Sequence, residues 1–172
     1  EAAPILRKAR DHPDVAAASV RLEGRALASR GDKSRGVVIA GVAPREERRV
    51  TVLFDAIVDG EPLAGSAPGV LVGEQLADAL KVRAGEELVF VGQAYDGSIS
   101  SGRFPVRGVF RTKIDELDGF VAVMPLDAVR EFFAAPGGAT AIALRLRDRE
   151  NLGAARASLA ASLGERYEVL GW

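Results

Sequence analysis

The side chains that could perform catalysis are few in this chain and stand far apart. His12 is the single histidine and no cysteine occurs, so a serine nucleophile would need His12 as its base. His12 lies between Asp11 and Pro13, at the end of a helix expected over residues 4–10, where the helix dipole favours a surface histidine. The chain carries no G-x-S-x-G elbow, P-loop or G-x-G-x-x-G phosphate loop. We therefore expect no catalytic residue and no ATP site.

Acidic side chains are the remaining candidates, because carboxylates hold metal ions. Asp115, Glu116 and Asp118 form the densest acidic group, but their spacing lacks the other ligands of a calcium loop. We expect a solvated, irregular segment over residues 111–118. Asp148 is expected to cap a last helix, where the positive dipole end favours a carboxylate. The sequence thus predicts no metal site and no cofactor.

Composition narrows the class of protein further. The chain has 172 residues, 48% of them hydrophobic and 27% charged, which suits one globular domain or two small lobes. Its 23 basic and 24 acidic residues produce no net field that would attract nucleic acid, so no nucleic-acid partner is expected. No apolar run approaches the roughly 20 residues that cross a bilayer.

Residues 69–91 carry the clearest structural pattern. Residues 70–72 are an apolar run between two glycines, as in a short buried strand. Leu76 and Leu80 lie four apart, on one face of a helix. Gly85 then interrupts the chain before an alternating strand begins. This stretch therefore predicts a strand, a short helix and a second strand.

The two ends of the chain predict related units. A helix and a strand over residues 16–28 open the chain, and residues 36–42 return to complete a long hairpin. Near the other end we expect a strand over residues 142–146, a helix, and a closing strand over residues 167–170. The expected helix carries an apolar stripe made by Leu152, Ala155, Leu159 and Leu163.

The middle of the chain is richer in strands than the ends. We expect a hairpin of residues 87–95 and 103–110, a strand over residues 120–124, and a helix with Pro125 at its first position. Strands and helices mixed in this way predict an α+β fold. The predicted organisation is a βαβ-type lobe from residues 1–36 and 138–172, and an inserted strand-rich lobe with short helices from residues 37–137.

Four segments, in this order, carry a resemblance to a known family. The first segment combines GVAP at residues 41–44 with IVDGEPL at residues 57–63. The other three are GVLVGEQLADALKVRAGEELVFV at residues 69–91, FPVRGVF at residues 104–110 and YEVLGW at residues 167–172. The order resembles the extracytoplasmic core domain of type VII ABC transporter permeases, closest to the lipoprotein-releasing and macrolide-exporter types. Lys81 stands where that family usually has glycine, and Glu86 where it often has aspartate.

The resemblance implies a location and a set of partners. In that family the domain is inserted between the first two transmembrane helices of an inner-membrane permease, so this domain would be periplasmic and the lobe from the chain ends would lie near the membrane. The implied partners are a cytoplasmic ABC ATPase, a second copy or paralogue of the permease, and a periplasmic carrier or lipoprotein cargo. Non-catalytic itself, the domain would couple ATP-driven movement of membrane helices to extrusion or transfer of a lipoprotein or other hydrophobic substrate.

The tip of the second hairpin is the predicted partner-binding site. Tyr95, Asp96, Ser98 and Ile99 form it, and an apolar Ile99 beside Tyr95 in a polar turn is the unusual feature. Carrier-recruiting relatives carry a long protruding loop here, whereas this chain has only residues 96–102. The short connection argues against a carrier docking at this hairpin.

A stand-alone soluble α+β module, for protein binding or scaffolding, is the alternative interpretation. It predicts a parent sequence with no hydrophobic helices around residues 1–172, whereas the permease interpretation predicts apolar spans of about 20 residues on both sides. An enzyme would instead show a polar pocket with perturbed titratable groups.

Overall fold

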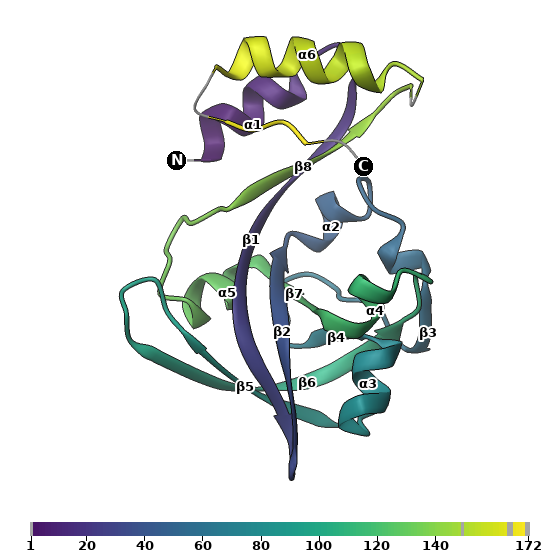
Figure 1. Ribbon diagram of the computed structural model, residues 1–172, viewed down its shortest axis with the longest axis vertical. Coiled ribbons are helices and arrows are strands. Elements are labelled where there is room, and N and C mark those ends of the chain that lie inside the picture. The colour runs from purple at the N-terminus through teal and green to yellow at the C-terminus, as the bar shows by residue number, and fades with distance from the viewer. Residues whose placement is uncertain (1, 149, 165–166, 171–172) are drawn as a thin grey trace.

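A computed structural model describes residues 2–148, 150–164 and 167–170 (Figure 1). Its first elements are α1 (Ala2–Arg10), β1 (Val15–Arg30), β2 (Lys33–Val42), α2 (Pro44–Glu47), a 3₁₀ turn η1 (Leu53–Asp55), β3 (Ile57–Gly60), β4 (Val70–Gly73) and α3 (Glu74–Leu80). The later ones are β5 (Glu87–Gln93), β6 (Ile99–Phe110), α4 (Asp115–Phe120), β7 (Val121–Pro125), α5 (Leu126–Phe132), β8 (Ala141–Leu146) and α6 (Leu152–Leu163). The predicted α+β class is confirmed. Across the described residues, no helix has the length and apolarity to cross a bilayer.

Six strands close into a ring. β1 pairs with β2, β2 with β7, β7 with β4, β4 with β6, β6 with β5, and β5 again with β1. The β2–β7 and β4–β6 pairs are parallel and the other four are antiparallel. β3 is added at β6, and β8 at the part of β1 that extends beyond the ring.

Alternate side chains of these strands fill two separate cores. The inward set forms one buried cluster with the apolar faces of α3 and α5, and it includes Val37 and Ile39, Val70 and Val72, Leu88 and Phe90, and Ala122 and Met124. Residues between them in the sequence, such as Leu71 and Val123, belong to a second cluster that covers the outside of the ring together with Leu53 and Phe54. Burying each large apolar side chain contributes roughly 1.5–3 kcal/mol, so both faces of β4 and β7 stabilise the fold.

Helix α5 comes close to the strands because glycines stand beneath it. A Cβ atom at Gly24 of β1 would lie 2.5 Å from Cζ of Phe133, and one at Gly41 of β2 would lie 2.6 Å from Cβ of Val129. These distances are shorter than any ordinary carbon contact. The two glycines therefore make room for the buried side chains on and after α5.

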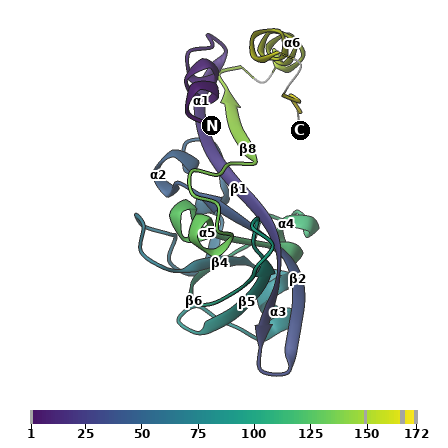
Figure 2. The same cartoon turned by 90° about the vertical axis from the view of Figure 1, so that its left-hand side faces the viewer.

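The two ends of the chain form the part drawn at the top of Figure 1. β8 pairs with residues 15–21 of β1, α1 packs on β1, and α6 packs on α1 (Figures 1 and 2). Ala155 and Leu159 of α6 are buried. From Arg21 onward β1 pairs with β2, so one strand runs through both parts. The predicted boundary after residue 36 falls inside β2, and the division into lobes 1–36 with 138–172 and 37–137 stays a prediction.

Most predicted elements are observed near their expected positions. The hairpin of β1 and β2 turns at Gly31, whose φ of +58° suits glycine, with Arg30 paired to Lys33. Residues 69–91 form β4, α3 and β5 as expected. Helix α5 begins one residue later than predicted, because Pro125 ends β7 and precedes the first helical residue.

Three expectations about secondary structure and helix capping are wrong. Residues 115–120 form α4 instead of an irregular segment; three acidic residues in its first turn favour a helix start. Asp148 does not cap α6, since its carboxylate accepts the Glu150 N–H and α6 begins only at Leu152 without a side-chain cap. Residues 167–170 form no strand, and the Val169 carbonyl accepts a hydrogen bond from Arg156 Nε at 2.7 Å. Gly171 and Trp172, which end the YEVLGW match, lie outside the described residues.

Substituting Gly24 by alanine tests the close packing of α5. The added methyl group has no room beside Phe133, so we expect Gly24→Ala to lower the free energy of unfolding by about 1–3 kcal/mol. Gly36→Ala, on the neighbouring strand with no atom within 4 Å of the added Cβ, should change it by less than about 0.5 kcal/mol. Chemical denaturation measures both; equal effects would contradict this account of α5.

Candidate functional site

The predicted site at the tip of the β5–β6 hairpin is a short, closed turn. β6 begins at Ile99 rather than at the expected Arg103, so the connection is shorter than predicted. Ala94 N–H donates to the Ser98 carbonyl at 2.8 Å. The Asp96 carboxylate accepts from both Ser98 N–H (2.9 Å) and Ser98 Oγ (2.6 Å). These two bonds hold the pKa of the Asp96 carboxyl below its ordinary value.

Tyr95 fastens this turn to the rest of the molecule. Its ring packs edge-on against Phe133 with 6.0 Å between ring centres, and its hydroxyl donates to the Glu23 carbonyl at 2.9 Å. Its backbone N–H donates to the Phe133 carbonyl at 2.9 Å. Of the four predicted residues, Tyr95, Asp96 and Ser98 therefore hold the turn in place. All four side chains are exposed, and Ile99, at 83% against 59% for Tyr95, is the apolar one that projects furthest into solvent.

Ile99 adjoins an apolar strip on the outside of the ring. It lies opposite Gln93 of β5, two residues beyond Val91, and Val91 lies opposite Leu27 of β1. Because opposite and alternate residues of antiparallel strands share a face, these side chains point outward together with Val89. Leu27, Val89 and Val91 are between 36% and 44% exposed. We name Leu27, Val89, Val91 and Ile99 the outer apolar face.

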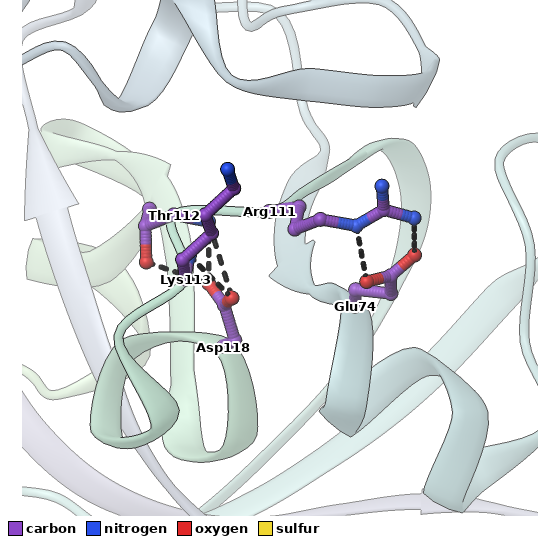
Figure 3. Close-up of polar contacts among 5 residues, drawn as sticks. All are labelled: Glu74, Arg111, Thr112, Lys113 and Asp118. Carbon is purple, nitrogen blue, oxygen red and sulfur yellow. Dashed lines mark hydrogen bonds and ion pairs between the residues drawn. The ribbon is translucent and has the colours of Figure 1, made fainter.

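Figure 3 shows Asp118, one of the three residues of the predicted acidic group. Asp118 is buried, and its carboxylate accepts hydrogen bonds from Thr112 N–H, Thr112 Oγ1 and Lys113 N–H at 2.7–3.1 Å. Asp115 instead accepts from Gln75 Nε2. Within the described residues, no three His, Cys, Asp or Glu side chains come together as metal ligands. Asp118 thus organises the loop before α4.

A second carboxylate in Figure 3 is neutralised by an ion pair. Glu74, the first residue of α3, accepts from Nε (2.5 Å) and Nη2 of Arg111. These hydrogen bonds hold the pKa of the Glu74 carboxyl below its ordinary value. The pair ties α3 to the end of β6, and its geometry leaves no free base or nucleophile.

His12 is more enclosed than the sequence predicts. Its side chain is only 8% exposed, and its Nε2 lies 2.9 Å from Ser158 Oγ of α6. Nδ1 accepts the backbone N–H of Asp14 at 3.3 Å. With both ring nitrogens occupied, His12 joins the end of α1 to α6, and the expectation of a surface histidine is wrong.

An open groove of about 1120 Å³ lies between α1, β8 and α6. Its apolar walls include Ile5, Ile142, Leu144 and Leu159, and exposed side chains of Val52, Leu152, Tyr167 and Leu170 also border it. Only part of the predicted apolar stripe of α6 is therefore buried inside the domain. Ala155 and Leu159 are buried, whereas Leu152 faces solvent.

Residues 1–162 match the family described as MacB-like periplasmic core domain. The chain belongs to this family. The predicted resemblance is confirmed: this core domain is the periplasmic part of an ABC transporter permease, in a family that is not catalytic.

One curated relative is similar to the chain in sequence, and two solved structures share its fold. The core domain is 25% identical over 164 residues to the lipoprotein-releasing system transmembrane protein LolC of Neisseria meningitidis serogroup B, covering 90% of this chain and 39% of that protein. The chain therefore spans about two fifths of the length of this relative.

The solved structures share the fold at low identity. The extracellular domain of the noncanonic ABC-type transporter YknZ from Gram-positive bacteria has a TM-score of 0.64 and 12% identity, covering 98% of this chain and 88% of that one. The periplasmic region of MacB from Actinobacillus actinomycetemcomitans has a TM-score of 0.63 and 16% identity, covering 94% and 72%.

Sequence reasoning found the hairpin tip of the core domain but missed most of the outer apolar face. Residues 88–91 are apolar at four successive positions, which marks a strand with two apolar faces. Leu88 and Phe90 fill the ring, so Val89 and Val91 had to lie outside it. The exposed Leu27 follows only from its register with Val91.

Truncating Asp118 tests its structural role. Asp118→Ala removes the carboxylate that accepts from the N–H groups of Thr112 and Lys113, and we expect a loss of about 1–3 kcal/mol in the free energy of unfolding. Asp115→Ala removes an exposed carboxylate and should change it by less than about 0.5 kcal/mol. Millimolar calcium should leave the melting temperature unchanged; a calcium-dependent rise would restore the metal-site hypothesis.

Titration of Asp96 tests the closed turn. We expect NMR to give Asp96 a carboxyl pKa below the ordinary value, and Ser98→Ala to raise it toward that value. Because the folded-state pKa is the lower one, the turn is stabilised at neutral pH and loses this contribution as the pH falls through the folded pKa. An unchanged Asp96 titration in Ser98→Ala would show that Ser98 is not the cause.

Proposed function

We propose that this core domain transmits the movement of permease helices to a substrate outside the membrane. A cytoplasmic ABC ATPase, as a separate subunit or domain, would supply the movement. The feature that best supports this role is the continuous strand β1, whose 16 residues extend roughly 50 Å through both parts of the domain. β1 is hydrogen-bonded to β8 over residues 15–21 and to β2 over residues 21–30, so a neighbouring strand supports it in both parts and movement at one end is passed to the other.

We propose a second copy or a paralogue of the permease as the partner of the hairpin tip. The outer apolar face, which includes Ile99, offers it apolar surface, and Tyr95, Asp96 and Ser98 hold the turn beside it in one position. An exposed apolar patch rimmed by polar residues is typical of protein contacts. A rigid tip also loses little conformational entropy on binding.

The proposed cargo is a lipoprotein or another hydrophobic substrate. The relative named as part of a lipoprotein-releasing system supports this proposal. A hydrophobic substrate needs apolar surface outside the membrane, and the groove between α1, β8 and α6 offers such surface for acyl chains. A periplasmic carrier would have to dock elsewhere than at the short β5–β6 turn.

Reconstitution of the parent protein tests the proposal. The parent and the ABC ATPase encoded with it would be placed in proteoliposomes, and ATP hydrolysis and substrate release measured with and without residues 1–172. Loss of release with retained ATP hydrolysis is the expected result. A parent that is recovered without membranes and without an ATPase would favour the alternative, a stand-alone binding or scaffold module.

Ile99→Glu tests the proposed partner surface. A charge at this exposed position should leave the free energy of unfolding within about 0.5 kcal/mol of the original, yet weaken association of the two permeases by about tenfold. Val58→Glu, at an exposed valine of β3, is the matched control and should leave association intact. Cross-linking or co-purification measures the association, and equal behaviour of the two variants would remove Ile99 from the interface.

A further inference from the structure

Arg21 marks the position at which β1 passes from one part of the domain to the other. On one edge it is paired with Val42 of β2, at the start of the ring register, and on the other with Ala141 of β8. Residues before Arg21 pair with β8, and residues after it pair with β2. A bend of β1 here would change the angle between the ring and the part formed by the chain ends.

Polar contacts from two other segments converge on Arg21. Its guanidinium donates from Nε (3.1 Å) and Nη2 (2.5 Å) to Oε1 of Glu47, the last residue of α2. Its carbonyl accepts the Thr140 N–H at 2.9 Å, and Thr140 Oγ1 accepts the Glu23 N–H at 2.8 Å. Thr140 belongs to the segment that connects α5 to β8. Glu47 and Thr140 therefore both contact Arg21, where β1 passes from one part of the domain to the other.

Glu47 is a buried carboxylate in which only one of the two oxygens accepts hydrogen bonds. Its side chain is 3% exposed, and Oε1 accepts both bonds from Arg21. Oε2 is buried and has no hydrogen-bond partner among the described residues. Asp118, the other buried carboxylate, has donors on both oxygens. Removing Arg21 would leave the buried carboxylate unpaired, which costs free energy, and an oxygen without a hydrogen bond is already unfavourable. Glu47 therefore holds Arg21 although one of its own oxygens makes no hydrogen bond.

We propose that the Arg21–Glu47 ion pair is a clamp that fixes the angle of β1 between the two parts of the domain and that yields during transport. That the ion pair fixes the angle of β1 is a statement about the domain alone. That it yields during transport rests on the proposed function, because only an assembled transporter would put force on the clamp. Arg21 and Glu47 are positioning residues in this account and do not touch substrate.

The chain itself permits a direct test of the angle. Since no cysteine occurs, cysteines introduced at exposed Arg7 of α1 and Ser101 of β6 would each carry a spin label, and pulsed electron paramagnetic resonance would report the distance between the two parts. We expect one distance in the original chain. Glu47→Gln keeps the shape of the side chain but removes its charge, and should populate a second distance in more than about 10% of molecules, above the usual range for a minor state.

A second ion pair provides the control. Glu74→Gln breaks the Arg111 pair, in which the guanidinium donates one bond to each carboxylate oxygen and ties α3 to the end of β6, away from Arg21, and should leave the distance single. An unchanged distance in Glu47→Gln, or an equal change in Glu74→Gln, would overturn the clamp. Should Glu47→Gln fail to fold, Arg21→Lys keeps the charge, loses the fork of two donors and is judged by the same criterion.

The transport half is tested in the full permease with its ATPase. We expect Glu47→Gln to lower the substrate released per ATP hydrolysed at least about twofold, while Glu74→Gln leaves this ratio unchanged. A second distance without any change in the ratio would refute the role in transport and leave the clamp standing. If the original protein releases no substrate at all, the proposed function fails instead, and the distance measurement still decides the clamp.

Discussion

Closure of the six-stranded ring is the constraint on which the rest of the domain depends. Each strand has to turn one set of alternate side chains inward, and the last strand has to meet the first in register. Once β5 and β2 occupy both edges of the second half of β1, only the first half of β1 can accept β8. The chain ends are therefore attached to the ring at one place, around Arg21.

Local sequence patterns predict the elements but not their closure. Residues 69–91 predict β4, α3 and β5 because glycines flank an apolar run and two leucines lie on one face of a helix. The parallel pairs β2–β7 and β4–β6 join segments far apart in the chain, and no local residue specifies that register. Helix α4 was missed for a different reason: the sequence does not show that the Asp118 carboxylate turns back to accept from Thr112 and Lys113 instead of facing solvent.

The candidate site could likewise be predicted only in part. An apolar Ile99 in a polar turn is visible in the sequence, and the structure leaves it exposed. The role of Tyr95 as an anchor depends on Glu23 and Phe133, which are distant in sequence, so it could not be predicted. The same holds for His12, whose partner Ser158 belongs to the far end of the chain. Long-range partners decide whether a polar side chain is free or engaged.

The self-contained β5–β6 turn also affects how such domains can diversify. Its hydrogen bonds close the loop locally, while the ring holds both strands, so the frame does not depend on the loop's length. Each doubling of a flexible loop costs only about 0.6 kcal/mol in closure entropy. An evolving lineage could thus gain or lose a protruding arm at this point in a few insertions or deletions. The same frame would serve transporters that recruit different periplasmic proteins, and transporters that recruit none.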